Sequence, residues 1–310
     1  MSSTRSATAR RTTSARRPPA RRPAARRRPP AKRGSRGAPA GSWRSWLPLG
    51  LVGLVVLGVV ALVRGIEGPD PVQLTGSCTV AGTGLTLTAE QAASAATIAA
   101  VGRARGLPER AVVIALATAQ QESTMRNLDH GDRDSLGLFQ QRPSQGWGTP
   151  EQVRDPVYSA GKFYDGLVRV RNWESLRLTD AAQRVQRSGF PEAYQKHESL
   201  AQQLTAAFAA PEPGRLTCRY QAPVPGGRLS ARVTAAAAVV EAELGATTTE
   251  RFGAVEVAPA AGWPAVTWAV AHAERLGLRS VAFAGSEWTP AGGWAPSDAG
   301  PDAVRLTLAR

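Results

Sequence analysis

The chain has 310 residues, of which 43% are hydrophobic, and this length allows about two domains with hydrophobic cores. Its net charge of +14 does not indicate a nucleic-acid-binding domain, because residues 1–44 hold 14 of the 38 Lys and Arg residues and no acidic residue. The remaining 24 basic residues (38 − 14) balance the 24 acidic ones. We therefore expect no nucleic-acid partner for the folded part.

The N-terminal part of the chain is typical of a membrane anchor behind a basic tail. Residues 1–44 are rich in Arg, Pro, Ala and Ser and are predicted to be a disordered cytoplasmic tail. Residues 45–64 include an apolar run at 47–63 that is long enough to span a thin membrane as one helix. The positive-inside rule predicts a single-pass protein of the cytoplasmic membrane with its main domains extracytoplasmic. A cleaved signal peptide is the alternative, and residues 65–84 are predicted to be a stalk.

The next segment, residues 85–210, shows helical patterns. Thr88 and Gln91 fit a capping box at the start of one helix. Pro108 fits the start of a second helix, which has one apolar face and reaches Glu122. Residues 79–217 are therefore predicted to form an all-helical domain of five or six helices without a convincing strand. The other helices are expected after Asp155-Pro156, at 179–189 and at 191–210.

The C-terminal third differs in composition. Residues 211–228 are rich in Pro and Gly, which predicts a linker. Residues 229–310 are predicted to be a small α/β or α+β domain of unknown role. Helices are expected at 230–244 and 264–276, and strands near 253–257, 279–284 and 303–309. The predicted fold class is therefore mainly α, with a helical domain behind one transmembrane helix and a small mixed domain after it.

Cys78 and Cys218 are the two cysteines of the chain. They show no metal-ligand spacing with each other or with the three histidines, so we expect neither a metal site nor a cofactor. Outside the membrane they could form a disulfide that stabilises the fold by about 4–5 kcal/mol on the chain-entropy model. The alternative is a pair of unlinked, small apolar residues.

Glu122 is the candidate catalytic residue, because it lies at the end of an apolar helix. An apolar surrounding disfavours a carboxylate and raises its pKa toward neutrality, as a general acid requires. The alternative is a solvated acid at a helix end. A choice between the two needs further residues.

Three short motifs carry a resemblance to a known family: Glu122-Ser123, then SLGLFQ at 135–140, then Ala193-Tyr194. In this order they resemble the lysozyme-like domain of soluble lytic transglycosylases, and the chain is similar to a group of actinobacterial membrane-anchored proteins of this type. The resemblance implies that Glu122 acts as acid and then base on the β-1,4 bond between N-acetylmuramic acid and N-acetylglucosamine. It implies substrate-binding roles for Ser123, Ser135, Gly137, Leu138, Phe139, Gln140 and Tyr194.

Two alternatives to this function remain open. The insert DHGDRD places Asp132 and Asp134 near Glu122 in the sequence, and a second carboxylate that positions a water would make the enzyme a hydrolytic muramidase. A non-catalytic wall-binding scaffold is the other alternative. The expected partners are peptidoglycan glycan strands, the cytoplasmic membrane through residues 47–63, and cell-wall or division proteins.

Overall fold

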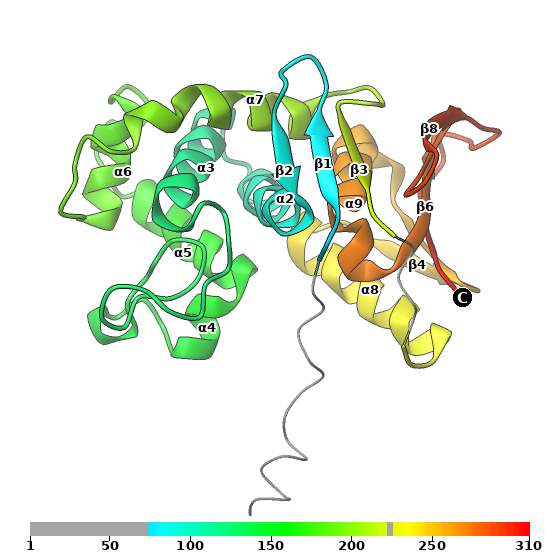
Figure 1. Ribbon diagram of the computed structural model, residues 1–310, viewed down its shortest axis with the longest axis horizontal. Coiled ribbons are helices and arrows are strands. Elements are labelled where there is room, and N and C mark those ends of the chain that lie inside the picture. The colour runs from blue at the N-terminus through cyan, green and yellow to red at the C-terminus, as the bar shows by residue number, and fades with distance from the viewer. Residues whose placement is uncertain (1–73, 222–225) are drawn as a thin grey trace, which may run out of the picture. The chain divides into compact units, whose positions relative to one another are not determined.

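The computed structural model describes residues 74–221 and 226–310. The described residues belong to one compact unit, residues 71–310 (Figure 1). The predicted tail at 1–44 and the predicted anchor at 45–64 lie outside the described residues. Within the described part, no helix is long and apolar enough to cross a membrane.

Helix α3 (Glu109–Ser123) lies at the centre of the helical part, where it contacts α2, α5, α6 and α7. The predicted capping box is confirmed at the start of α2 (Ala89–Ala104), where Thr88 and Gln91 cap each other. Helix α3 ends where Thr124 adopts a left-handed conformation, with a φ of 53°. The other elements here are η1 (Pro143–Gln145), α4 (Pro150–Arg154), α5 (Pro156–Leu167), α6 (Leu178–Gln186), η2 (Gln195–His197) and α7 (Glu198–Ala209).

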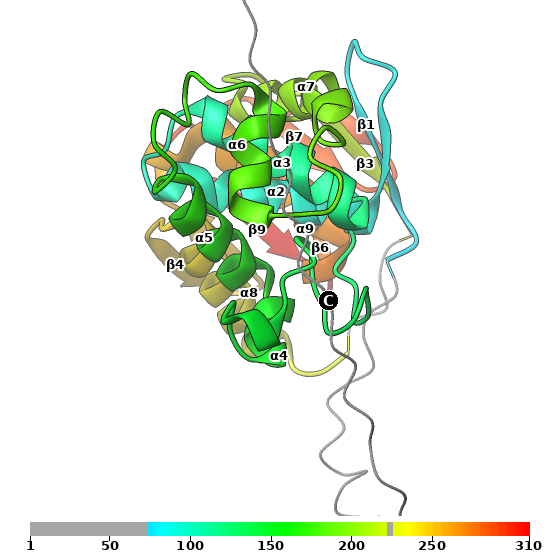
Figure 2. The same ribbon diagram turned by 90° about the vertical axis from the view of Figure 1, so that its left-hand side faces the viewer.

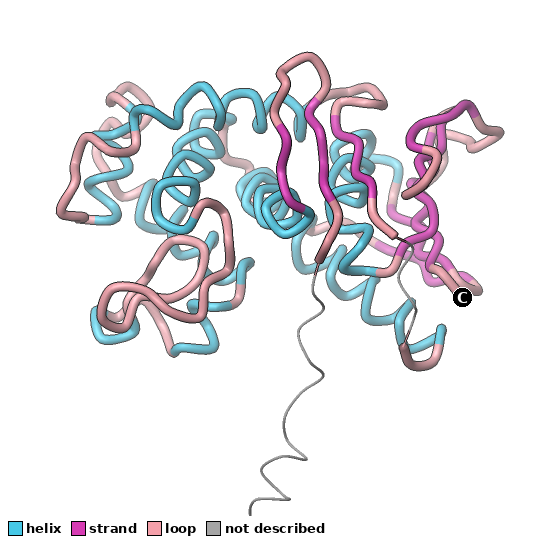
Figure 3. Tube along the Cα trace, viewed as in Figure 1, coloured by secondary structure: helices cyan, strands magenta, loops and turns pink. Residues whose placement is uncertain are grey.

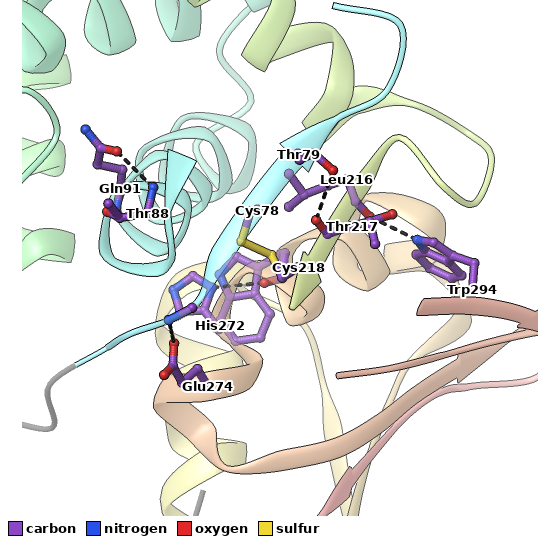
Figure 4. The surroundings of a disulfide bond; sticks show 12 residues. Cys78, Thr79, Thr88, Gln91, Leu216, Thr217, Cys218, His272, Glu274 and Trp294 are labelled. Carbon is purple, nitrogen blue, oxygen red and sulfur yellow. Dashed lines mark hydrogen bonds between the residues drawn. A yellow bond between two sulfur atoms is a disulfide. The ribbon is translucent and has the colours of Figure 1, made fainter. Parts of the chain in front are cut away.

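A three-stranded antiparallel sheet joins the two ends of this helical segment. Its order is β2 (Thr86–Thr88), β1 (Ser77–Val80) and β3 (Leu216–Arg219). Cys78 on β1 faces Cys218 on β3, and a disulfide links them across 140 positions of sequence (Figure 4). The predicted disulfide is thereby confirmed.

The C-terminal part consists of two helices and a six-stranded antiparallel sheet (Figure 3). The strand order is β4-β5-β9-β6-β7-β8. Helices α8 (Leu229–Leu244) and α9 (Gly262–Leu276) lie where helices were predicted. The short helix η3 (Pro259–Ala261) precedes α9, and the strands are β4 (Thr248–Arg251), β5 (Ala254–Val257), β6 (Leu278–Phe283), β7 (Ser286–Thr289), β8 (Gly293–Pro296) and β9 (Val304–Leu308).

The predicted mainly α fold class is wrong. The described structure has eight α-helices and two antiparallel sheets of three and six strands, with about 47% helix and 17% strand. In the small sheet, β1 and β3 lie in segments that were predicted to be a stalk and a linker, and β2 lies at the start of the segment that was predicted to be helical. These strands have three or four residues each, and β1 pairs with β3 across a long stretch of sequence, so no clear local pattern marks the sheet. In the larger sheet, β4 and the β7–β8 hairpin were also missed.

A buried polar cluster connects the C-terminal helices to α2. The Thr97 hydroxyl on α2 and the Trp268 indole on α9 both donate to Glu243 Oε2, at 2.7 and 2.8 Å. His272 Nε2 lies 3.3 Å from the same carboxylate, and both side chains are at most 2% exposed. Because buried charges require partners, this cluster fixes how α8 and α9 pack against α2.

Candidate active site

Glu122 occupies the last turn of α3 and is half-buried. Upstream of it the helix is almost wholly buried, and residues such as Ile114 and Leu116 have no exposed surface. Burial raises the pKa of the Glu122 carboxyl, while hydrogen bonds from Tyr194 and Gln186 act in the opposite direction. The resulting pKa is higher than that of an ordinary glutamate, as a proton donor needs.

Two side chains donate hydrogen bonds to the same oxygen of this carboxylate. The Tyr194 hydroxyl lies 2.6 Å from Glu122 Oε1, and Gln186 Nε2 lies 3.1 Å from it. Among the described residues, Glu122 Oε2 has no hydrogen-bond partner. Burial and the neighbouring Glu122 raise the pKa of Tyr194, so its hydroxyl remains a donor at neutral pH. Glu122 is therefore held by one oxygen and leaves the other available for proton transfer.

The SLGLFQ turn is attached to the end of α3 by buried groups. Ser123 Oγ donates to the backbone carbonyl of Leu138 at 2.7 Å, and the side chains of Leu138 and Phe139 have no exposed surface. Phe139 stacks on Phe163, with ring centroids 4.8 Å apart. The side chains of these three predicted substrate-binding residues thus have interior positions, and they hold the turn beside Glu122.

The other residues of this turn explain its shape. Gly137 has a φ of +75°, and a Cβ at this position would lie only 2.2 Å from the carbonyl oxygen of Val153, so no larger residue fits without movement. Gln140 also has a positive φ, of 47°, and its side-chain amide donates to the carbonyl of His130 at 3.2 Å. Ser135 is buried at the start of the turn. Of these three residues, Gln140 has the more accessible side chain.

The two candidate second carboxylates are placed differently from Glu122. Asp134 binds Arg142 Nε at 2.7 Å and the backbone N–H of Ser144 at 2.8 Å, and these bonds hold its pKa well below the usual range. Asp132 is exposed, and its backbone carbonyl accepts the N–H of Ser135. Within the described residues, neither carboxylate forms a hydrogen bond with Glu122. The insert therefore contacts the loop residues that follow it in the sequence, and these contacts hold it in place.

Gln186 is the residue that sequence reasoning missed. It is the last residue of α6, which packs on α3 (Figure 2). A polar residue at a helix end is so common that nothing in the sequence distinguishes it. A second contact that was missed joins His197 Nε2 to Gln121 Oε1 at 3.0 Å, next to Glu122 on α3.

A separate cavity of about 770 Å³ lies between α2, the α8–β4 loop and the start of α9. Small apolar residues, Trp263 and Phe283 form most of its lining, which also includes Arg103. Glu122 is not among the lining residues. This cavity is therefore separate from the candidate catalytic residue.

Comparison with models of known protein families finds no match to this chain, and comparison with curated proteins also finds none. The resemblance to lytic transglycosylases thus depends on the three motifs and on the geometry around Glu122.

Proposed function

We propose that this chain cleaves the β-1,4 bond between N-acetylmuramic acid and N-acetylglucosamine in peptidoglycan, with Glu122 as acid and then base. The observation that carries this proposal is the placement of Glu122. It ends an apolar helix, its pKa is raised by burial, and Tyr194 and Gln186 hold one of its oxygens. Tyr194 belongs to the third motif of the resemblance, and its contact with Glu122 supports the assignment.

The proposed reaction needs one carboxyl group. Protonated Glu122 gives its proton to the glycosidic oxygen while the bond from the muramic-acid C1 to that oxygen breaks. The Glu122 carboxylate then removes the proton from the C6 hydroxyl of the same muramic acid. At the same time, the C6 oxygen forms a bond to C1. The products are a 1,6-anhydro end and a free 4-hydroxyl, and no water is consumed. The engagement of Asp134 by Arg142 and Ser144 favours this outcome over hydrolysis.

The proposed location is the outer face of the cytoplasmic membrane. The Cys78–Cys218 disulfide supports an oxidising compartment. The anchor at 47–63, peptidoglycan as the substrate, and cell-wall or division proteins as partners remain predictions from the sequence.

The test is Glu122→Gln with purified peptidoglycan as substrate. Loss of the general acid should reduce the release of soluble fragments by about a hundredfold to ten-thousandfold. Glu109→Gln is a matched control, because it makes the same change at the opposite, exposed end of α3. Mass spectrometry of the fragments distinguishes the anhydro end from a reducing end, which contains one more water.

Two other results would contradict the proposal. Equal rates for wild type and Glu122→Gln would remove Glu122 from the chemistry. Sedimentation of the wild-type protein with intact peptidoglycan, without any fragment release, would indicate the non-catalytic binding protein instead.

A further inference from the structure

We propose that Gln186 is a positioning residue that links the SLGLFQ turn to Glu122 and directs the transferable proton to Glu122 Oε2. This inference rests on the proposed function, and it assigns a role to a residue that none of the three motifs contains. The evidence is the arrangement of hydrogen bonds around one side-chain amide.

The carbonyl of Phe139 sets the orientation of the Gln186 amide. Gln186 Nε2 lies 2.8 Å from Phe139 O and 3.1 Å from Glu122 Oε1. A carbonyl only accepts hydrogen bonds, so the opposite amide orientation would place two oxygens against each other. One N–H therefore points to the turn, and the second N–H points to Glu122.

Tyr194 provides the second donor to the same oxygen of Glu122, at 2.6 Å. An sp² oxygen has two lone pairs. With both occupied by donors, the proton of the acid form belongs on Glu122 Oε2, the oxygen without a partner among the described residues. The turn thus acts on the acid through Gln186, and Tyr194 completes the arrangement.

The carbonyl oxygen of the Gln186 side chain supports a functional reason for a glutamine at this position. Gln186 Oε1 is buried and has no hydrogen-bond partner among the described residues. An unpaired buried carbonyl disfavours folding, and an apolar residue of similar size would avoid this loss. The two N–H donors are therefore the part of the side chain that is used.

The groups that face Glu122 make the expected titration simple to interpret. Tyr194 is a titratable side chain in hydrogen-bond contact with it, whereas Gln186 and the Phe139 carbonyl are neutral. His197 faces the neighbouring Gln121, and burial lowers its pKa. A change at Gln186 therefore acts on Glu122 through a hydrogen bond, with no new charge unless one is introduced.

The experiment compares Gln186→Leu and Gln186→Lys in the full chain. Carboxyl ¹³C NMR follows the titration of Glu122, and the pH profile of peptidoglycan cleavage is measured in parallel. Gln186→Leu removes a donor to the carboxylate, so the pKa of Glu122 should rise. The basic limb of the pH profile of cleavage should then move to higher pH. The value of kcat should fall, and KM should not change. Gln186→Lys introduces a cationic donor and should move the pKa in the opposite direction.

Gln141→Leu is the matched control for this experiment. Gln141 is a buried glutamine that, like the partly buried Gln186, donates to a backbone carbonyl, here that of Ser159 at 3.1 Å, and its Oε1 lacks a partner among the described residues. Its replacement removes the same kind of side-chain amide away from Glu122 and should leave the Glu122 titration unchanged.

The inference and the proposed function fail in different ways. An unchanged Glu122 titration in folded Gln186→Leu, or equal changes in Gln186→Leu and Gln141→Leu, overturns the inference. Wild-type protein that releases no peptidoglycan fragments overturns the proposed function even if the titrations move as expected. Opposite shifts in the Leu and Lys variants, together with a matching movement of the pH profile, support both.

Discussion

Removal of the Cys78–Cys218 disulfide should greatly destabilise the fold. The bond closes a loop of 140 positions, and the chain-entropy relation then gives a loss of about 5 kcal/mol at 25 °C when the link is removed. The double variant Cys78→Ala/Cys218→Ala tests this without a free thiol, since the chain has no other cysteine. The loop contains the whole candidate active site, so activity should be lost at a lower denaturant concentration in the variant.

Equilibrium unfolding in urea measures this loss. The midpoint should fall, and the m-value should rise because the unfolded chain without the link is more expanded. Wild-type protein under reducing conditions is the control and should resemble the double variant. If the unfolding free energies of the wild type and the double variant agreed within about 0.5 kcal/mol, this prediction would be refuted, because the link would then not constrain the unfolded chain.

Two further predictions concern carboxyl groups whose pKa values are shifted in opposite directions, those of the half-buried Glu122 and the buried Glu243. The raised pKa of Glu122 means that its stabilising contribution is complete below the unfolded pKa, about 4.3, and is lost as the pH rises through the folded pKa. Glu122→Gln should therefore raise the unfolding temperature at pH 7 and not at pH 4, as followed by circular dichroism. For Glu243, burial opposes ionisation, but His272 and three hydrogen bonds outweigh it and lower the pKa to about 2. Its contribution is present above about pH 4.3 and is lost toward pH 2. Glu243→Gln should lose about 3–5 kcal/mol of unfolding free energy at pH 7 and show a weaker loss on acidification in urea titrations.

Local patterns were sufficient to predict the starts of α2 and α3. The capping box at Thr88 and the helix start at Pro108 depend on neighbours within four residues, and both predictions agree with α2 and α3. Helix α6 shows the limit of this reasoning. It ends at Gln186, because Arg187 adopts a left-handed conformation with a φ of 54°, two residues before the glycine that was expected to stop the helix.

Long-range pairing explains what the sequence could not predict. Strands β1 and β3 have four residues each and form a sheet because residues 136 to 142 positions apart lie opposite each other, in register with the disulfide. The two cysteines were the one sign that the two segments meet. Gln186 was missed for a related reason, since its importance appears only when α6 packs beside α3.

The surroundings of Glu122 divide into groups that favour each half of the proposed reaction. Burial and the carbonyl dipoles at the end of α3 disfavour the carboxylate, and this helps it to take back a proton in the second half. The donors Tyr194 and Gln186 stabilise the carboxylate, and this helps it to release its proton in the first half. Loss of either donor should therefore slow the cleavage of the glycosidic bond more than the closure of the anhydro ring. An acid that reverses its role on the same substrate needs both influences, and here they act in opposite directions on the carboxylate of one half-buried side chain.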